Sequence, residues 1–344
     1  MYMKTEQELF EHFRLVVDKG QSPLRIDKFL VSKMESTSRN RIQLAAEGNY
    51  LLVNDKPVKS NYKVRPLDDI RLMLPFEKRE FRLIPQPIPL NVVFEDKDLM
   101  VLNKPSGMVV HPGHGNYTHT LLNGLAWHLG LREEVEQEDI RMGVLVHRLD
   151  KDTTGVLVAA KSEVAQFKLA KQFFEKEVDR VYTALVWGDV QENEGTINAP
   201  IARHPSDRLK FYVPAKETQG RHAVTHYRVL ERLGYVTLLE CRLETGRTHQ
   251  IRVHTEHMGH PIFGDPRYGG NRIRKGTPYT KYKQFVDNCF GLLPRQALHA
   301  QTLGFIHPVL EKRMEFHVPL PEDFEAVLGK WRQYAVSARP TGDL

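Results

Sequence analysis

Residues 147–155 form a polar stretch that reads His147-Arg148-Leu149-Asp150-Lys151-Asp152-Thr153-Thr154-Gly155. Apolar runs rich in β-branched residues lie on both sides of it, at 143–146 and 155–160. Such runs are typical of buried strands, so we expect the polar stretch to present its side chains from the end of a sheet. Basic neighbours would keep Asp150 ionised, and an ionised carboxylate can act as a nucleophile or a base. In the alternative interpretation, Asp150 or Asp152 caps backbone donors and Arg148 forms a surface ion pair.

The sequence on either side of this stretch alternates strand-like and helix-like segments. Helices are expected at 120–129, where Gly130 ends the apolar pattern, and from Ser162, a suitable N-cap residue, to Glu177. Because strands outnumber helices and many are adjacent in sequence, we predict an α+β fold with a mostly antiparallel or mixed sheet and flanking helices. The further strands are expected at 99–103, 108–110, 181–186, 223–230 and 235–243.

A second polar segment, residues 244–254, follows one of these predicted strands. Thr248 is placed to cap a helix that carries Arg252 and His254, and a helix start beside Arg247 is a favourable site for an anion. The neighbouring histidines occur at steps that can suggest zinc, but no cysteine accompanies them, so we expect no metal site. Contacts to phosphate, or capping, are the preferred interpretation of His249, His254, His257 and His260.

Length and composition indicate a folded protein of about two domains. The chain has 344 residues, of which 41% are apolar, enough to build real cores. Its two cysteines, Cys241 and Cys289, give neither a disulfide framework nor a thiolate zinc site. No apolar run approaches the roughly 18 residues of a membrane span, and the charged first ten residues do not resemble a signal peptide. We therefore expect a soluble, cytoplasmic protein, a monomer that does not act at a membrane.

The positive charge is concentrated near the amino terminus. Residues 22–82 contain thirteen Lys and Arg against eight Asp and Glu, and so carry five of the six net positive charges of the chain. A basic module attached to a balanced one favours a nucleic-acid partner, although a scattered solvated surface would give the same count. Residues 83–90 carry Pro85, Pro87 and Pro89, which predict an extended, stiff linker after this module.

The basic module has the pattern of two short helices followed by short strands. Apolar residues from Ile26 to Met34 share one helix face, and Ser36 or Ser38 can cap a second helix that Gly48 ends. This pattern resembles the small RNA-binding domain that ribosomal proteins and some tRNA synthetases share. A structural helical hairpin with a solvated basic face is the alternative. The side chains that we expect to contact phosphate lie at helix starts and in the bend, at Arg25, Lys28, Arg39 and Arg41.

The larger module resembles the RluA/RluD-type pseudouridine synthases of ribosomal RNA. The likeness is carried by ordered motifs: His147-Arg148-Leu149-Asp150-x-x-Thr153-Thr154-Gly155, Asn103-Lys104-Pro105-x-Gly107, Tyr182-x-Ala184-Leu185-Val186-x-Gly188, Gly246-Arg247-x-His249-Gln250-Ile251-Arg252-x-His254, His260-Pro261-x-x-Gly264-Asp265-x-x-Tyr268-Gly269 and Leu298-His299-Ala300. With the basic module included, the resemblance covers about residues 22 to 325. It implies a bent, mostly antiparallel catalytic sheet with the active cleft across its middle.

The resemblance also implies residue roles. A target uridine would flip out of the RNA, Arg148 would fill the space it leaves, and Asp150 would attack the ribose, attack the ring or remove a ribose proton. Arg252 would pair with Asp150, and Tyr182 would stack on the uracil and take the ring proton. No cofactor or metal is implied, and the RNA would be large-subunit rRNA or a ribosomal precursor particle. RNA contacts are expected from His147, Arg247, His249 and Gln250.

The resemblance gives a domain plan and leaves alternatives. We expect an extension at 1–21, the RNA-binding domain at 22–82, the linker at 83–90, the catalytic domain at 91–331 and a polar tail at 332–344. A tRNA pseudouridine synthase of the same family and a non-catalytic ribosome-assembly protein stay open. A methyltransferase is disfavoured because no Gly-x-Gly-x-x-Gly occurs, and a glycosidase because its two carboxylates would need special geometry. Residues 266–285, rich in cations and aromatics, predict an RNA-contacting insertion through Arg272, Arg274 and Lys275.

Overall fold

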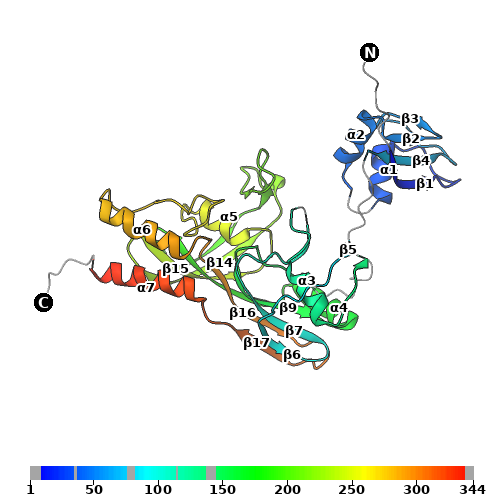
Figure 1. The fold of residues 1–344 in the computed structure, drawn as a ribbon. Coiled ribbons are helices and arrows are strands. Elements are labelled where there is room, and N and C mark those ends of the chain that lie inside the picture. The colour runs from blue at the N-terminus through cyan, green and yellow to red at the C-terminus, as the bar shows by residue number, and fades with distance from the viewer. Residues whose placement is uncertain (1–8, 35–36, 76–81, 114, 137–144, 338–344) are drawn as a thin grey trace, which may run out of the picture. The chain divides into compact units, whose positions relative to one another are not determined.

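The computed structural model of the protein describes residues 9–34, 37–75, 82–113, 115–136 and 145–337. The chain divides into two compact units, residues 1–81 and 82–344, shown in Figure 1. Each unit has a hydrophobic core of its own, as expected for two domains.

The first unit is a small antiparallel sheet with two helices packed on it. Apolar residues of both helices, among them Ile26, Phe29 and Ile42, are buried together with Leu51 and Ile70 of the sheet. The expected cap is confirmed, since the Ser38 hydroxyl accepts the N–H of Arg41. In chain order the elements are β1 (Phe10–Val16), α1 (Ile26–Lys33), α2 (Arg39–Glu47), β2 (Leu51–Val53), β3 (Lys56–Pro57) and β4 (Asp69–Leu74). In the sheet, the strands lie in the order β1-β4-β2-β3.

Strand β1 corrects the expected boundary of this unit. Its residues were assigned to an extension, but they pair with β4 from Phe10 opposite Leu74 to Val16 opposite Asp69. Val17, directly after the strand, is fully buried in the core of the unit. The unit therefore begins before residue 22, and β1 is its edge strand.

The second unit is built on a nine-stranded sheet. Every pairing in this sheet is antiparallel except that of β16 with β9, which is parallel, so the expected mostly antiparallel mixed sheet is confirmed. The strands run in the order β11 (Glu194–Asn198), β14 (Val224–Arg232), β15 (Val236–Leu243), β10 (Asp179–Trp187), β16 (Leu298–Ile306), β9 (Thr154–Ala160), β7 (Leu99–Lys104) and β6 (Val92–Glu95), with β17 (Arg313–His317) on β16. Two short pairs lie outside it, β5 (Arg82–Leu83) with β8 (Val135–Glu136) and β12 (Ala202–Arg203) with β13 (Phe211–Tyr212).

Helices cover both faces of this sheet. The larger core joins the sheet to α3 (Leu121–His128), α6 (Thr280–Leu292) and α7 (Glu322–Ser337), and a smaller core on the other face joins it to α4 (Glu163–Glu175). Helix α5 (Gln250–His257) follows β15 (Figure 1). The expected cap of α4 is confirmed by the Ser162 hydroxyl, which accepts the N–H of Ala165. Thr120, which was expected as the first residue of its helix, caps α3 in the same way through the N–H of Asn123. None of the helices in the described ranges combines the length and the apolar character needed to cross a bilayer.

The proline-rich segment 83–90 is packed on the second unit. Leu83 is buried in the larger core, and Asn123 of α3 donates its side-chain amide to the carbonyl of Ile84 at 2.8 Å. The backbone N–H of Gln86 in turn bonds to the Asn123 carbonyl, and Ile88 contacts Gly124. The segment is extended, as its prolines require, but its residues belong to the fold of the second unit.

Three other expectations differ from the structure in extent. Residues 108–110 form no strand, because the backbone after Lys104 turns around that side chain. The strand expected at 143–146 lies partly outside the described residues, and Leu145 forms an isolated bridge with Ala159. Helix α7 continues to Ser337, where a polar tail from 332 was expected, because Tyr334 stacks on Phe285 with ring centroids 4.8 Å apart.

Candidate active site

The polar stretch 147–153 leads into β9 at the middle of the large sheet. Thr154 and Gly155 lie opposite His299 and Ala300 of β16 in the parallel pairing. The φ of Gly155 is +119°, and a Cβ there would stand 2.1 Å from the carbonyl oxygen of Ala300. Only glycine allows this approach, which fixes the end of the loop against the sheet.

Asp150 lies beside Arg252, a residue 102 positions later in the chain. The Nη1 of Arg252 donates to Oδ2 of Asp150 at 2.9 Å. Nε and Nη2 of the same guanidinium donate to the two carboxylate oxygens of Asp265, at 2.7 and 3.0 Å. The side chains of Arg252 and Asp265 are 6% and 0% exposed, whereas that of Asp150 is 17% exposed. One arginine thus joins a fully buried carboxylate to one that solvent can reach.

The role of Asp265 was not assigned from the sequence, although its motif was noted. Besides Arg252, it accepts the backbone N–H groups of Arg267 and Tyr268, so both of its oxygens are occupied. Burial would lower the pKa of Arg252, but the hydrogen bonds to Asp265 and Asp150 outweigh burial and raise that pKa above its ordinary value. Arg252 is therefore a permanently charged partner for Asp150.

A cavity of about 60 Å³ opens next to these charges. Asp150 and Arg252 line it together with Tyr182 of β10, whose side chain is almost completely buried and whose pKa is raised by that burial. Arg148 and Arg247 are exposed at its rim. Seven of the predicted site residues therefore share one cavity: Arg148, Asp150, Tyr182, Arg247, His249, Gln250 and Arg252.

His249 also lines this cavity, at the start of α5. Its Nδ1 is 2.9 Å from the hydroxyl of Tyr268, and its Nε2 is 3.9 Å from Oδ2 of Asp150. Burial lowers the pKa of His249 to about 4, so the imidazole is neutral near pH 7. The expectation that Thr248 caps the helix is wrong: His249, with φ +58°, is the N-cap residue and makes no side-chain cap.

Two of the predicted RNA-contacting residues form hydrogen bonds within the protein, and one of them, Gln250, also lines the cavity. The ring of His147 stacks on Phe173 of α4, with centroids 4.5 Å apart, and its Nε2 accepts the N–H of Val158 at 3.0 Å. Gln250 is buried, and its amide bonds to four groups in the two segments that it joins. Both side chains fix the loops of the site, and their hydrogen-bonding atoms face the protein.

Lys104 is a second residue whose role the sequence did not reveal. It is 1% exposed, and its ammonium donates to three carbonyl oxygens, those of Pro105, Met108 and Lys151, at 2.8 to 2.9 Å. Lys151 directly follows Asp150, so this buried charge holds the loop that carries the carboxylate. Burial lowers the pKa of Lys104 to about 7, against the opposing effect of Asp152 and Asp150.

The basic residues predicted in the first unit differ in their surroundings. Arg25 and Arg39 both donate to the buried carboxylate of Asp27, at 2.9 Å in each case, and hydrogen bonding to Arg25, opposed by burial, lowers the pKa of Asp27 to about 2. Their side chains remain 40% and 49% exposed, so the pairing orders two guanidinium groups at the surface. Lys28 and Arg41 are exposed on the same two helices.

The basic segment 272–275 lies at the surface of the second unit. Arg272, Arg274 and Lys275 are exposed, but none of them lines the cavity of Asp150. Lys275 lies beside Gly188, the residue that follows the last residue of β10 and comes six positions after Tyr182. Arg272 and Arg274 lie beside Gly269, which follows Tyr268, and the hydroxyl of Tyr268 bonds to His249 at the cavity. Contact between this segment and RNA stays a prediction.

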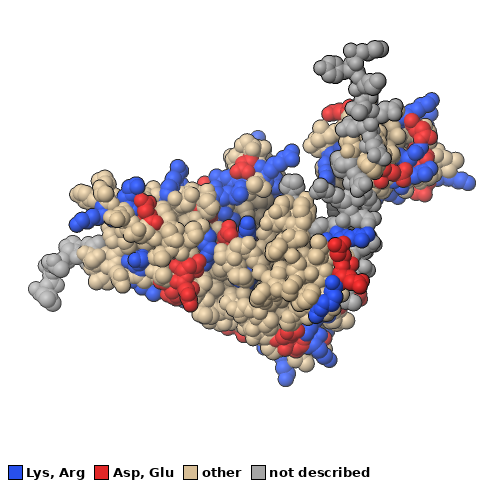
Figure 2. Space-filling model, viewed as in Figure 1, with Lys and Arg blue, Asp and Glu red and all other residues tan. Residues whose placement is uncertain are grey.

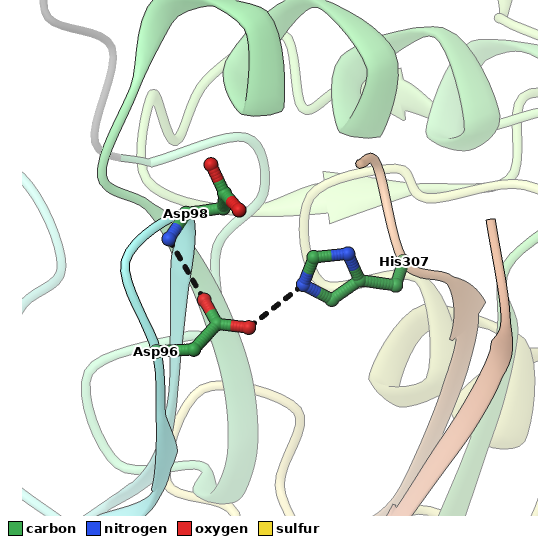
Figure 3. A group of neighbouring side chains, drawn as sticks. All are labelled: Asp96, Asp98 and His307. Carbon is green, nitrogen blue, oxygen red and sulfur yellow. Dashed lines mark hydrogen bonds and ion pairs between the residues drawn. The ribbon is translucent and has the colours of Figure 1, made fainter. Parts of the chain in front are cut away.

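One group of side chains in the described ranges has the spacing of metal ligands: Asp96, Asp98 and His307 (Figure 3). His307 Nε2 bonds to Asp96 at 2.8 Å, while its Nδ1 accepts the backbone N–H groups of Val309 and Leu310. The other Asp96 oxygen accepts two backbone N–H groups. With both imidazole nitrogens and both Asp96 oxygens occupied, the group is a hydrogen-bonded link between two turns.

Comparison with known proteins agrees with this geometry. The sequence profile described as RNA pseudouridylate synthase matches residues 98–257. A protein of Chlorobaculum parvum that is named as an uncharacterized RNA pseudouridine synthase is 46% identical over 92% of this chain and 97% of its own length. Ribosomal large subunit pseudouridine synthase D of Xanthomonas campestris is 40% identical over 94% of this chain and 93% of its own length.

A solved structure shares the fold of the second unit. Human RNA Pseudouridylate Synthase Domain Containing 4 is 28% identical and matches with a TM-score of 0.54, over 70% of this chain and 93% of its own. The profile includes Asp150, Tyr182 and Arg252, three of the residues brought together at the cavity. The chain belongs to the RNA pseudouridine synthases, in the RluA/RluD-type group.

Proposed function

We propose that this protein converts uridine into pseudouridine in RNA, with Asp150 as the carboxylate that begins the reaction. The observation that carries the proposal is the ion pair of Asp150 with Arg252 inside a cavity that Tyr182 also lines. A partly exposed carboxylate held by a buried arginine has a fixed direction and lies within reach of a substrate.

The reaction is an isomerisation, so its atoms balance within the nucleotide. The bond between ring N1 and ribose C1′ breaks, a bond between ring C5 and C1′ forms, and the proton on C5 is replaced by one on N1. Asp150 can attack C1′, attack the ring or remove a ribose proton, and each route starts from the same ionised oxygen. No external oxidant, reductant or group donor is needed.

The surrounding residues supply positioning. The guanidinium of Arg148, exposed at the rim, has the planar shape to stack where the flipped base was. Tyr182 offers an aromatic face to the uracil, and its hydroxyl is a candidate acceptor for the C5 proton. Arg252 fixes the direction of the Asp150 carboxylate, since Asp265 holds the other edge of the guanidinium.

We further propose that the substrate is large-subunit ribosomal RNA. Relatives that are about 40% identical over most of the chain are named for the ribosomal large subunit. The exposed guanidinium groups of Arg25 and Arg39, with Lys28 and Arg41, give the first unit a surface suited to phosphates, so this unit would add affinity for a folded RNA. A cytoplasmic monomer stays our expectation from the sequence.

The test is tritium release from RNA labelled at C5 of uridine. Incubation with transcribed large-subunit rRNA should release label to water, and mapping should place pseudouridine at defined positions. Release from transfer RNA alone would redirect the proposal to the tRNA enzymes of the family. Binding of RNA without release from any of these substrates would favour a non-catalytic assembly protein.

A further inference from the structure

A second, larger cavity lies beside the active site. It has a volume of about 620 Å³, and we call it the flanking groove, defined by Arg203, Phe211, Gln219, Arg221, Arg247 and Thr248 among its lining residues. Arg247 lines both this groove and the cavity of Asp150, so the two are neighbours that share that side chain. The groove is formed between the loop that follows β15 and the hairpin of β12 and β13.

The groove carries concentrated positive charge. Three of its lining residues are arginines, and none of the lining residues whose side chains the structure describes is acidic. Within the described part of the chain, Arg203, Arg221 and Arg247 form no ion pair, whereas the exposed arginines Arg228 and Arg242 both pair with Glu240. Figure 2 shows lysine and arginine side chains gathered on the lobe beside α5 that contains this hairpin. Guanidinium groups that converge without a carboxylate favour a polyanion.

The groove is firmly tied to the catalytic residues. The N–H of Phe211 donates to the Tyr268 hydroxyl at 3.1 Å, and this hydroxyl also bonds to His249. The ring of Phe211 lies edge-on to the ring of His249. The guanidinium of Arg203 lies 5.1 Å from the centroid of the Phe211 ring. On the other wall, Arg247 Nε donates to the carbonyl of His222. The groove therefore has a fixed position relative to Asp150.

We propose that the flanking groove binds the sugar-phosphate backbone of the RNA strand next to the target uridine. The inference rests on the proposed function, because a flipped nucleotide stays joined to its neighbours through its phosphates. The cavity of Asp150 is the smaller of the two, so the nucleotides on either side of the flipped uridine are expected to lie outside it, past the rim. Arg247 stands at the junction with the larger groove, and Arg203 and Arg221 line its course. The ligand class is single-stranded RNA backbone, read by charge and not by base sequence.

The test uses the full chain with Arg203 and Arg221 both changed to Gln, and transcribed large-subunit rRNA as the probe. Each phosphate of a single strand that is no longer neutralised reduces the slope of log K against log salt by about 0.7, so the double variant should lower it by about 1.4. Affinity near 0.1 M KCl should fall at least about tenfold. The matched control changes Arg228 and Arg242 to Gln, the same loss of charge outside the groove, and should leave slope and affinity unchanged.

Changing Arg203 and Arg221 to Lys keeps the charge and should retain most of the affinity, which separates weaker phosphate binding from misfolding. An affinity and a salt slope equal to those of the wild type in the Gln double variant would overturn the proposal. Tritium release by the wild type is measured in the same samples. Its absence would contradict the proposed function, whereas release with an unchanged salt slope in the Gln variant would contradict only the flanking groove.

Discussion

Asp265 binds the guanidinium of Arg252 with both of its carboxylate oxygens, at 2.7 and 3.0 Å, and leaves Nη1 of that arginine directed at Asp150. The fully buried carboxylate of Asp265 therefore orients the guanidinium of Arg252, and this guanidinium in turn orients the carboxylate of Asp150. Because Asp265 does not line the cavity, it is a positioning residue.

Changing Asp265 to Asn should weaken this arrangement. Loss of one partner from a buried ion pair costs about 3 kcal/mol of unfolding free energy, measurable by urea titration. Turnover should fall while the affinity for RNA holds, since Asp265 faces Arg252 and the backbone of 267–268. Asp207, which is exposed and 4.0 Å from Arg267, gives the control: its change to Asn should alter neither quantity. An Asp265 variant with normal turnover would refute the positioning role.

Lys104 should matter for the loop of Asp150. Changing it to Met leaves three buried carbonyl oxygens without their donor, which should lower the unfolding free energy by about 2 kcal/mol and slow single-turnover isomerisation. Lys161 bonds to Glu95 and to a carbonyl oxygen of Asp96, on the surface away from the cavity. Its change to Met should leave the single-turnover rate as it was. Equal rates for the two variants would show that Lys104 does not hold the loop.

How well the sequence predicted a helix or a strand depended on how far along the chain its hydrogen-bonding partner lies. The ends of α3 and α4 were predictable because Thr120 and Ser162 bond to groups three residues away. Strand β1 was missed because its partner β4 begins more than fifty residues later and the polar residues of β1 break the alternation of apolar side chains. Local patterns report caps and periodicity, whereas pairing across a sheet is decided by the whole fold.

The same reason explains the site. The motifs pointed to Asp150, Tyr182 and Arg252, and the structure brings all three to one cavity. The buried charges Lys104 and Asp265 looked like ordinary polar residues, since their partners Lys151 and Arg252 come together only on folding. His147 and Gln250 lie in motifs and form hydrogen bonds within the protein, because a polar side chain can hold neighbouring segments together as readily as contact a ligand.

Buried histidines should make the fold sensitive to acid. Burial lowers the pKa to about 3 for His147 and to about 4 for His249, His254 and His299. The unfolded chain binds protons at these side chains below about pH 6.5 and the folded chain does not, so stability is retained above that pH and lost as pH falls toward 4. At pH 5, each of these histidines lowers the free energy of unfolding by an amount on the order of 1 kcal/mol. Urea titrations at pH 7 and pH 5 measure this loss, and equal stability at both would exclude it.

The two units should be separable in function. Removing residues 1–81 leaves the second unit its own core and keeps Leu83 and the carbonyl of Ile84 in place, so the shortened chain should fold. It should isomerise an excess of short RNA at a near-normal rate, but should bind intact rRNA more weakly and with a smaller salt slope. Thermal melting and filter binding check the two claims. Unchanged rRNA affinity would show that the first unit is not an RNA grip.

The most direct measurement compares Asp150→Asn with Asp152→Asn in single-turnover tritium release. Asn keeps the volume and hydrogen-bonding capacity of Asp150 but removes its charge, so release should fall at least about 10³-fold, under any of the three routes, while RNA binding is retained. Asp152 does not line the cavity, and its variant should keep most of its activity. Normal release by the Asp150 variant, or loss confined to the Asp152 variant, would contradict the account.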